Sequence, residues 1–376
     1  MSLRILLIDD QPASVEPVEE ELRAKVVGAQ PKTVGFDTAQ QMLQDFEPHV
    51  VVLDILKGHI AGEGEPIGLK TLDYVWTERF CPLVIYTAVP ELVEDDLRKG
   101  HPFVKVVKKG RDSEQEVVSC IDRFAPHISA LDEVGREIHA AMTKALKEVA
   151  PRIFESLTDP QQIDDMLTRS ARRRVAAAMD DALSTGGPTL RSWEHYLCPP
   201  SSGHLLTGDI IRNRKGDPKD PLAYAVVLTP SCDLVHDEQR EPKVSEALVA
   251  CCKGADRVLQ DLALDGWKNK HRDKLLPLLR AGYGPSCLPL ASLPGKFPPM
   301  AADLRALKLI ALGKIGNFEE SECGEYVRIA SVDSPFRELV SWVYMHVAAR
   351  PGLPDRDWNS WAEEIIGTFH TTGSGN

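Results

Sequence analysis

The sequence lacks the long apolar segments that mark a membrane protein. No stretch approaches the roughly 18 consecutive apolar residues of a membrane-spanning helix, and the first residues form a strand-like pattern without the profile of a signal peptide. The eight cysteines are few and dispersed for a chain of 376 residues, which excludes the closely spaced framework of a small disulfide-stabilised protein. We therefore expect a cytoplasmic protein with reduced thiols and without a membrane partner.

An excess of basic residues is also absent. Lysine and arginine total 44 against 56 aspartate and glutamate residues, which gives a formal net charge of -12. A protein covered by a nucleic-acid-binding surface carries the opposite balance, so we do not expect nucleic acid as a partner. Aromatic residues make up only 6% of the chain, but 43% of it is hydrophobic, which is ordinary for globular material of two or three domains.

Two apolar runs near the start of the chain end in aspartate. Residues 5–8 are followed by Asp9 and Asp10, and residues 50–53 are followed by Asp54. Continuous apolar runs of this length are typical of buried parallel strands. If the two strands are neighbours, three carboxylates converge at one edge of the sheet, and their repulsion is tolerated only where a cation or a proton transfer requires it. We interpret this edge as a functional site.

The first 112 residues alternate between strand and helix patterns. Strands are predicted over residues 4–8, 32–36, 49–53, 83–86 and 103–107, and helices over residues 13–25, 38–46 and 67–80, from residue 91 and from residue 113. This alternation predicts an α/β fold with a doubly wound, five-stranded parallel sheet, in which function lies at the carboxyl ends of the strands. The residues at these ends are Asp9, Asp10, Asp54, Thr87 and Lys109.

In this order and spacing, the acidic pair, Asp54, Thr87 and the lysine resemble the receiver domain of bacterial two-component response regulators. The resemblance covers residues 1 to about 120 and implies a flavodoxin-like fold. It implies a bacterial phosphoprotein that acts in signal transduction through a phosphorelay, with a histidine kinase or a histidine phosphotransfer protein as partner. Taken singly, each residue has a simpler explanation, since aspartate commonly caps a helix and lysine at a strand end is commonly solvated.

The resemblance also implies a role for each residue of this edge. Asp54 is expected to be the phosphoacceptor, and Lys109 is expected to pair with the phosphoryl oxygens. The Thr87 hydroxyl is expected to donate to one of these oxygens and to move on phosphorylation. The implied Mg²⁺ ligands are Asp9, Asp10, Asp54 and the backbone carbonyl of Leu56, in keeping with the preference of this hard cation for oxygen.

Three features depart from the usual receiver pattern. The turn over residues 55–66 contains three glycines and is longer than the loop that receivers place there, which suggests an unusual flap over the site. Gly110 stands where the family usually has proline, so the conserved lysine is either Lys108 or Lys109, and we prefer Lys109. Val106 stands where many receivers carry an aromatic residue, which puts that form of the switch in doubt.

Residues 113 to about 183 have a helical pattern that is too long for the last helix of a receiver alone. Apolar residues recur every three or four positions, Asp159-Pro160 breaks the pattern, and a second helix is predicted over residues 161–183. One interpretation is a signalling helix that pairs with a second copy, giving a homodimer on phosphorylation. The other is an intramolecular helical hairpin. The arginines of the second helix, at positions 169 and 172–174, alternate with acidic residues and are more typical of a solvated face.

The composition changes after residues 184–188, and the remainder predicts a mixed α+β domain. Strand patterns occur at residues 208–211, 223–228, 247–251 and 326–331, and a helix is predicted to open at Ser334-Pro335. We therefore expect a receiver domain over residues 1–125, a helical linker over residues 126–185 and an output domain over residues 186–376.

The output domain contains one local motif that could carry out chemistry, Thr-Pro-Ser-Cys-Asp-Leu at residues 229–234. Cys232 follows an apolar strand and could act as a nucleophile if a helix begins beside it. Alternatively, zinc could be bound by Cys232, His236, Cys251, Cys252 and Cys287, although no Cys-x-x-Cys pair is present. Ordinary packing of small buried thiols is the third explanation and the one we favour.

These observations predict a response regulator that is phosphorylated on Asp54 with Mg²⁺ and controls a non-DNA-binding output domain through a helical linker and dimerisation. An effector enzyme centred on Cys232, with a degenerate receiver as scaffold, is the main alternative. A DNA-binding transcriptional regulator is the third and rests only on how often receivers are joined to DNA-binding domains. Whether the output domain is catalytic is left open.

Overall fold

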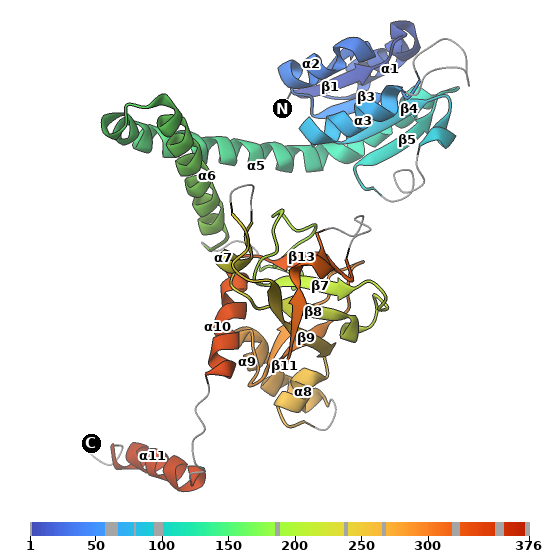
Figure 1. Cartoon of the computed structure of the whole chain (residues 1–376). Coiled ribbons are helices and arrows are strands. Elements are labelled where there is room, and N and C mark those ends of the chain that lie inside the picture. Colours follow the sequence, from blue (N-terminus) through green and yellow to red (C-terminus); the bar gives the residue numbers. More distant parts are fainter. Residues whose placement is uncertain are drawn as a thin grey trace. The chain divides into compact units, whose positions relative to one another are not determined.

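The chain divides into two compact units, Met1–Gly187 and Pro188–Asn376 (Figure 1). The computed structural model describes residues 2–56, 67–78, 80–93, 101–184, 189–236, 240–264, 268–317, 324–349 and 357–372. None of the helices in these ranges is long and apolar enough to cross a membrane. We call the two units the N-terminal unit and the C-terminal unit.

The N-terminal unit is built on a five-stranded parallel sheet, as the sequence predicts. Its strands are β1 (Leu3–Ile8), β2 (Ala29–Val34), β3 (Val50–Leu53), β4 (Leu83–Thr87) and β5 (Val104–Lys108), in the order β2-β1-β3-β4-β5. Its helices are α1 (Pro12–Lys25), α2 (Phe36–Phe46), α3 (Ile67–Glu78), α5 (Ser113–Ser156) and α6 (Pro160–Ser184), with a 3-10 turn η1 (Pro90–Leu92). This strand order is that of a doubly wound, flavodoxin-like sheet.

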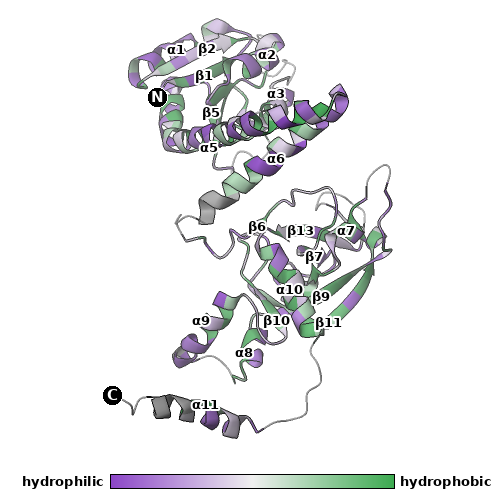
Figure 2. Cartoon of the chain, turned by 90° about the vertical axis from the view of Figure 1, so that its left-hand side faces the viewer, coloured by the Kyte–Doolittle hydropathy of each residue, from purple (hydrophilic) through white to green (hydrophobic). Residues whose placement is uncertain are grey.

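Helices cover both faces of this sheet because successive strand residues point to opposite sides. Ile5 and Leu7 pack with α1 and the start of α5 in one cluster, whereas Leu6 and Ile8 pack with α2 and α3 in another. In Figure 2 the central strands are accordingly hydrophobic, while α1 and α5 carry many hydrophilic residues. The second strand begins and ends earlier than expected, because Phe36 turns into α2 and is buried there.

The helix α5 runs without interruption for 44 residues, through Pro126 and Pro151. Its later part packs against α6, where Ala145, Ile153 and Ile163 are buried and Arg174 pairs with Glu148 at 3.0 Å. The three-residue connection between the two helices suits a hairpin. The intramolecular hairpin considered from the sequence is therefore present, whereas pairing with a second copy stays a prediction.

The C-terminal unit contains an eight-stranded, mostly antiparallel sheet and is mixed α+β, as predicted. Its strands are β6 (Tyr196–Leu197), β7 (Asp209–Asn213), β8 (Tyr224–Val227), β9 (Glu246–Gly254), β10 (Cys287–Leu290), β11 (Met300–Ala311), β12 (Ile315–Gly316) and β13 (Tyr326–Val332). The order is β10-β11-β9-β8-β7-β13-β12, with β6 beside β13. Among the strands that the structure describes in this unit, only β12 and β13 pair in parallel.

Helices of the C-terminal unit are α7 (Ser231–Leu234), α8 (Arg257–Asp261), α9 (Arg272–Ala281), α10 (Phe336–Ala348) and α11 (Trp358–Thr372), with 3-10 turns at Pro221–Ala223, Asn269–His271 and Leu312–Lys314. The four predicted strands correspond to β7, β8, β9 and β13, and the helix predicted at Ser334-Pro335 corresponds to α10. Strands β10 and β11 were not predicted. Prolines in and around β10 resemble loop signals, and a register shift divides β11 between Ala302 and Leu307, which interrupts the alternation of its residues.

A buried ion pair joins β7 to β13 in this unit. Arg328 Nε lies 2.7 Å from Asp209 Oδ2, and both side chains are fully buried at 0% exposure. Ser331 Oγ donates to Asp209 Oδ1 at 2.5 Å, the Leu206 amide donates to Oδ2 at 2.6 Å, and Arg328 Nη1 donates to the Ser202 carbonyl at 2.6 Å. Burial raises the pKa of Asp209 and lowers the pKa of Arg328, because the partner charge only partly replaces lost hydration. Each charge therefore depends on the other.

Asp209→Ala is expected to lower the free energy of unfolding of the C-terminal unit by about 3–5 kcal/mol, because it leaves a guanidinium buried without a counter-charge. Urea unfolding followed by tryptophan fluorescence measures this, since five of the six tryptophans lie in that unit. The control is Glu325→Gln, which removes an ion pair between Glu325, 41% exposed, and Lys314, 61% exposed. Loss of this exposed pair should lower the free energy of unfolding by less than about 0.5 kcal/mol. Equal losses in the two variants would contradict the prediction.

Candidate functional site

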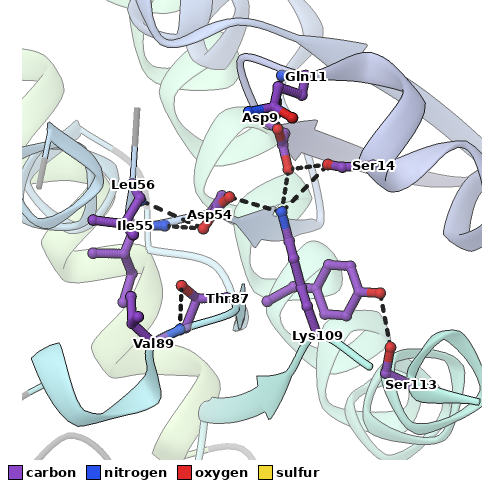
Figure 3. Close-up of polar contacts among 11 residues, drawn as sticks. Asp9, Gln11, Ser14, Asp54, Ile55, Leu56, Thr87, Val89, Lys109 and Ser113 are labelled. Atoms are coloured by element: carbon purple, nitrogen blue, oxygen red, sulfur yellow. Dashed lines mark hydrogen bonds and ion pairs between the residues drawn. The ribbon is translucent and has the colours of Figure 1, made fainter. Parts of the chain in front are cut away.

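The residues singled out from the sequence lie along the carboxyl edge of the parallel sheet. Asp9 directly follows β1, Asp54 follows β3, Thr87 is the last residue of β4 and Lys109 follows β5. Because β1 and β3 are hydrogen-bonded neighbours, Asp9 and Asp54 must emerge side by side. Figure 3 shows the Lys109 side chain extending toward both carboxylates.

The Lys109 ammonium group bridges the two carboxylates. Its Nζ lies 2.6 Å from Asp9 Oδ2 and 2.7 Å from Asp54 Oδ2, and it donates to Ser14 Oγ at 3.3 Å. Burial, the largest single influence, opposes the charge, but the hydrogen bonds and negative charges of Asp54 and Asp9 together outweigh it and raise the pKa of Lys109. Lys108 is exposed at the end of β5, so the lysine of this site is Lys109.

Hydrogen bonds from nearby residues orient both carboxylates. Asp9, which is only 1% exposed, accepts from the Ser14 hydroxyl at 2.6 Å and from the Gln11 amide at 2.8 Å. Asp54 Oδ1 accepts from the Ile55 amide at 2.7 Å, which leaves Oδ2 facing Lys109. Sequence reasoning missed Ser14 and Gln11, although both stand in the segment that leads from Asp9 into α1. The site is thus held in place from β1, α1 and β3 together.

The remaining predicted residues lie at the same edge. The Thr87 side chain is fully buried, and its Oγ1 accepts from the Val89 amide at 3.4 Å. Asp10 is partly exposed beside Asp9, and Leu56 is buried two residues after Asp54. The long turn expected over residues 55–66 lies outside the described residues, apart from Ile55 and Leu56. The roles assigned to these residues stay predictions.

A second set of contacts connects Lys109 to the start of α5. Its Nζ lies 5.4 Å from the centroid of the Tyr86 ring, a distance that suits a cation–π contact. The Tyr86 hydroxyl lies 2.8 Å from Ser113 Oγ, and Ser113, the first residue of α5, donates to the Gly110 carbonyl at 2.7 Å. The sequence pattern did not predict a role for Tyr86, because the aromatic residue of many receivers is expected at the position of Val106 on β5. The aromatic residue near the site comes from β4.

The oxygen atoms at this edge suit a hard cation. Within the described ranges, no three His, Cys, Asp or Glu side chains lie close enough together to hold a metal ion by themselves. However, Asp9 and Asp54 already share one positive group, the Lys109 ammonium. Mg²⁺ commonly uses only one or two protein carboxylates and keeps several water ligands. Asp9 and Asp54 are therefore donors of the type that Mg²⁺ prefers, in the number of carboxylates that it commonly uses.

In the described part of the C-terminal unit, no three His, Cys, Asp or Glu side chains come together as a zinc site requires. Cys251 and Cys252 are adjacent on β9 and therefore point to opposite faces of the sheet. Cys252 and Cys287 belong to two different hydrophobic clusters, and burial raises the pKa of both thiols, to about 12 for Cys287. For these two cysteines, the packing explanation agrees with the structure.

Cys232 lies on the four-residue helix α7 and is exposed. Its Sγ is 3.5 Å from Asp233 Oδ1, and the nearby His236 ring packs against His204 with the ring centroids 5.0 Å apart. The contact that the thiol makes is thus with a carboxylate and not with a basic nitrogen, which is the usual partner of an activated nucleophile. This arrangement gives no support to the nucleophile interpretation.

Comparison with known proteins gives matches only among solved structures. No known protein family matches the chain, and no curated protein matches it. The N-terminal domain of a response regulator/sensory box/GGDEF three-domain protein from Carboxydothermus hydrogenoformans is 20% identical, with a TM-score of 0.27, over 35% of this chain and 98% of that chain. A two-component transcriptional regulator AraC from Clostridium phytofermentans is 18% identical, with a TM-score of 0.26, over 34% and 99% of the two chains.

A third match is the response regulator PhyR from Brucella abortus, which is 20% identical with a TM-score of 0.27 over 35% of this chain and 52% of that chain. All three similarities cover about a third of this chain. The strand order β2-β1-β3-β4-β5, with helices on both faces of the sheet, shows the fold independently. Residues 1 to about 120 have the fold of a receiver domain, as the sequence indicated.

Lys109→Met is expected to lower the free energy of unfolding of the N-terminal unit by about 1–3 kcal/mol near neutral pH, because Asp9 and Asp54 would then repel each other. Since the pKa of Lys109 is raised in the folded state, its stabilisation is fully present below the ordinary lysine value of 10.5 and is lost as the pH rises through the higher folded value. Urea unfolding of wild type and variant over this pH range measures the difference.

The matched control for this measurement is Lys108→Met, which removes an exposed ammonium one residue away. Its effect should stay within about 0.5 kcal/mol. If Lys108→Met destabilised the unit as much as Lys109→Met, the bridging contacts would not be the source of the stabilisation.

Proposed function

We propose that this protein is a response regulator of a two-component phosphorelay, in which Asp54 accepts a phosphoryl group and the C-terminal unit is a non-DNA-binding output domain. The observation that carries the proposal is the single ammonium group held between Asp9 and Asp54 at the carboxyl edge of the sheet. A site that neutralises two adjacent carboxylates can also neutralise an approaching anionic phosphate. The five-stranded parallel sheet and the charged residues at its carboxyl edge support the same proposal.

The proposed reaction moves a phosphoryl group from a donor histidine to Asp54. An Asp54 carboxylate oxygen attacks the phosphorus atom, a new O–P bond forms, and the P–N bond to the histidine breaks. The histidine leaves with the electron pair of that bond and takes up a proton, so the product is an acyl phosphate. The donor belongs to a histidine kinase or a histidine phosphotransfer protein.

The residues around Asp54 supply positive charge and hydrogen bonds to the transferred group. Lys109 is close enough to exchange its contact with Asp54 Oδ2 for one with a phosphoryl oxygen, and the Thr87 hydroxyl is proposed to turn toward another oxygen. The proposed Mg²⁺ ligands are Asp9, Asp10, Asp54 and the Leu56 carbonyl. When bound, this ion supplies charge that offsets the negative oxygens of the phosphoryl group.

We infer that the signal passes from the site to α5 through Tyr86. Lys109 touches both Asp54 and the Tyr86 ring, and the Tyr86 hydroxyl contacts Ser113 at the first position of α5. A change in the Lys109 position on phosphorylation therefore acts on a residue that anchors the helix. In this proposal residues 1–125 are the receiver, residues 126–185 the helical linker and residues 186–376 the output domain.

The exposed part of α5 supports the proposed homodimer. Leu131, Val134 and Ile138 are 43%, 48% and 42% exposed and lie three and four residues apart, on one side of the helix. They follow Ile128, the last α5 residue of the cluster that packs on the parallel sheet, and Leu131 also lines a hollow together with Phe80. Such a stripe suits pairing with the same stripe of a second copy. Phosphorylation is proposed to favour this pairing.

Incubation with acetyl phosphate and Mg²⁺ is expected to add the mass of one phosphoryl group to the intact protein. The addition should disappear in Asp54→Asn and when EDTA removes the metal, because both the nucleophile and the charge compensation are required. The matched control is Asp45→Asn, which changes an exposed aspartate on α2 of the same unit and should leave the addition unchanged. Modification that persists in Asp54→Asn would overturn the site assignment.

Tyr86→Phe is expected to weaken transmission without affecting phosphorylation, because it removes only the hydroxyl that contacts Ser113. Hydrogen exchange over the first turns of α5, compared before and after phosphorylation, should change at least about twofold less in the variant than in wild type. Intact mass confirms that both proteins are equally phosphorylated. The control is Tyr74→Phe on α3, which removes a hydroxyl that accepts a hydrogen bond from Gln44. Identical exchange changes in wild type, Tyr86→Phe and Tyr74→Phe would contradict the route through Tyr86.

A further inference from the structure

The C-terminal unit contains a cavity of about 740 Å³ that the proposed phosphoryl transfer does not use. It lies between strands β10 and β11 and the helices α8, α9 and α10. Its walls are mostly aliphatic, and the main contributors are Val258, Leu275, Leu279, Leu290, Leu339 and Val340. This volume falls within the roughly 300–1,000 Å³ of small-molecule sites, and the apolar lining is also typical of them.

One side of the cavity is formed by aromatic rings. The His195 ring lies 4.0 Å from the Tyr196 ring and 5.3 Å from the Phe336 ring, measured between centroids, and both His195 and Phe336 line the cavity. Tyr196 is itself fixed by a hydrogen bond of 2.9 Å from its hydroxyl to the Ala291 carbonyl. These contacts hold the His195 ring in place, and the Phe336 ring, tilted by 52° to it, adds a second aromatic group to the wall.

The imidazole of His195 provides a polar group in this apolar wall. Burial lowers its pKa despite a hydrogen bond to the backbone of Ser192, so the ring is neutral at physiological pH. A neutral imidazole has one donor and one acceptor nitrogen, and its acceptor matches a hydroxyl or N–H group of a ligand.

The charges near the cavity favour neither sign. Asp256 and Arg280 line it, both are exposed to solvent, and their charges are opposite. A charged ligand would lose hydration in the apolar interior without gaining a buried counter-charge, which is strongly unfavourable. An uncharged ligand loses much less hydration free energy on entering the cavity.

We propose that this cavity binds a small, uncharged and largely apolar molecule that carries one hydrogen-bond donor, so that the C-terminal unit is a ligand-binding domain. The inference is independent of the proposed phosphorylation, because every lining residue belongs to the C-terminal unit. Loss of either activity in an experiment would therefore leave the other untouched.

Calorimetric titration of the full chain with three biphenyl probes tests the proposal. The expected order of affinity is 4-phenylphenol first, biphenyl next and biphenyl-4-carboxylate last, with the carboxylate at least about tenfold weaker than the phenol because of the buried charge. His195→Phe keeps an aromatic ring but removes the acceptor, so it should weaken the phenol about fivefold or more and leave biphenyl unchanged. Thermal unfolding confirms that each variant remains folded.

Filling the cavity provides the second arm of the test. Ala281→Trp adds a large ring at an exposed residue that lines the cavity, and it should weaken all binding probes at least about tenfold. The matched control is Ala348→Trp, at an exposed alanine of α10 that does not line the cavity, which should bind as wild type does. No binding of 4-phenylphenol, equal binding of the carboxylate, or binding that survives Ala281→Trp would each overturn the proposal.

Discussion

The ammonium group of Lys109 offsets the repulsion between two carboxylates that the fold of the N-terminal unit brings together. Parallel pairing of β1 with β3 brings Asp9 and Asp54 to the same edge, and oxygens bound to a common Nζ at 2.6 and 2.7 Å are at most about 5 Å apart. Two negative charges at this separation repel by about 3 kcal/mol at an effective dielectric constant near 20. The Lys109 ammonium group therefore offsets the repulsion between Asp9 and Asp54, and the other contacts of the site form around carboxylates that are already neutralised.

Much of the N-terminal unit could be predicted because its sequence signals are local. Apolar runs of four residues, each followed by a polar group, gave β1 and β3 and the positions of Asp9 and Asp54. Contacts between distant parts of the chain could not be read in this way. Nothing in the sequence relates Ser14 to Lys109 or Tyr86 to Ser113, because these pairs depend on how helices pack on the finished sheet.

The C-terminal unit was harder to predict because its sheet is antiparallel and its pairs are distant in sequence. The pairing of Asp209 with Arg328 joins residues far apart on the chain, and neither residue stands in a recognisable motif. The cysteines gave a misleading signal for a similar reason. Cys251 and Cys252 look like paired ligands in the sequence, but adjacent positions on β9 face opposite sides of the sheet.

The uninterrupted length of α5 has a mechanical consequence. With a rise of about 1.5 Å per residue, its 44 residues span about 66 Å. A rigid rod of this length, tilted by about 5° at Ser113, moves its far end by about 6 Å, which exceeds one helical turn. A rearrangement of less than an ångström around the Tyr86 hydroxyl can therefore become a displacement as large as a side chain where α5 meets α6. In the proposed signal route the helix would act as a lever arm, and the two positions where it lacks a backbone N–H donor, Pro126 and Pro151, are where that lever would bend first.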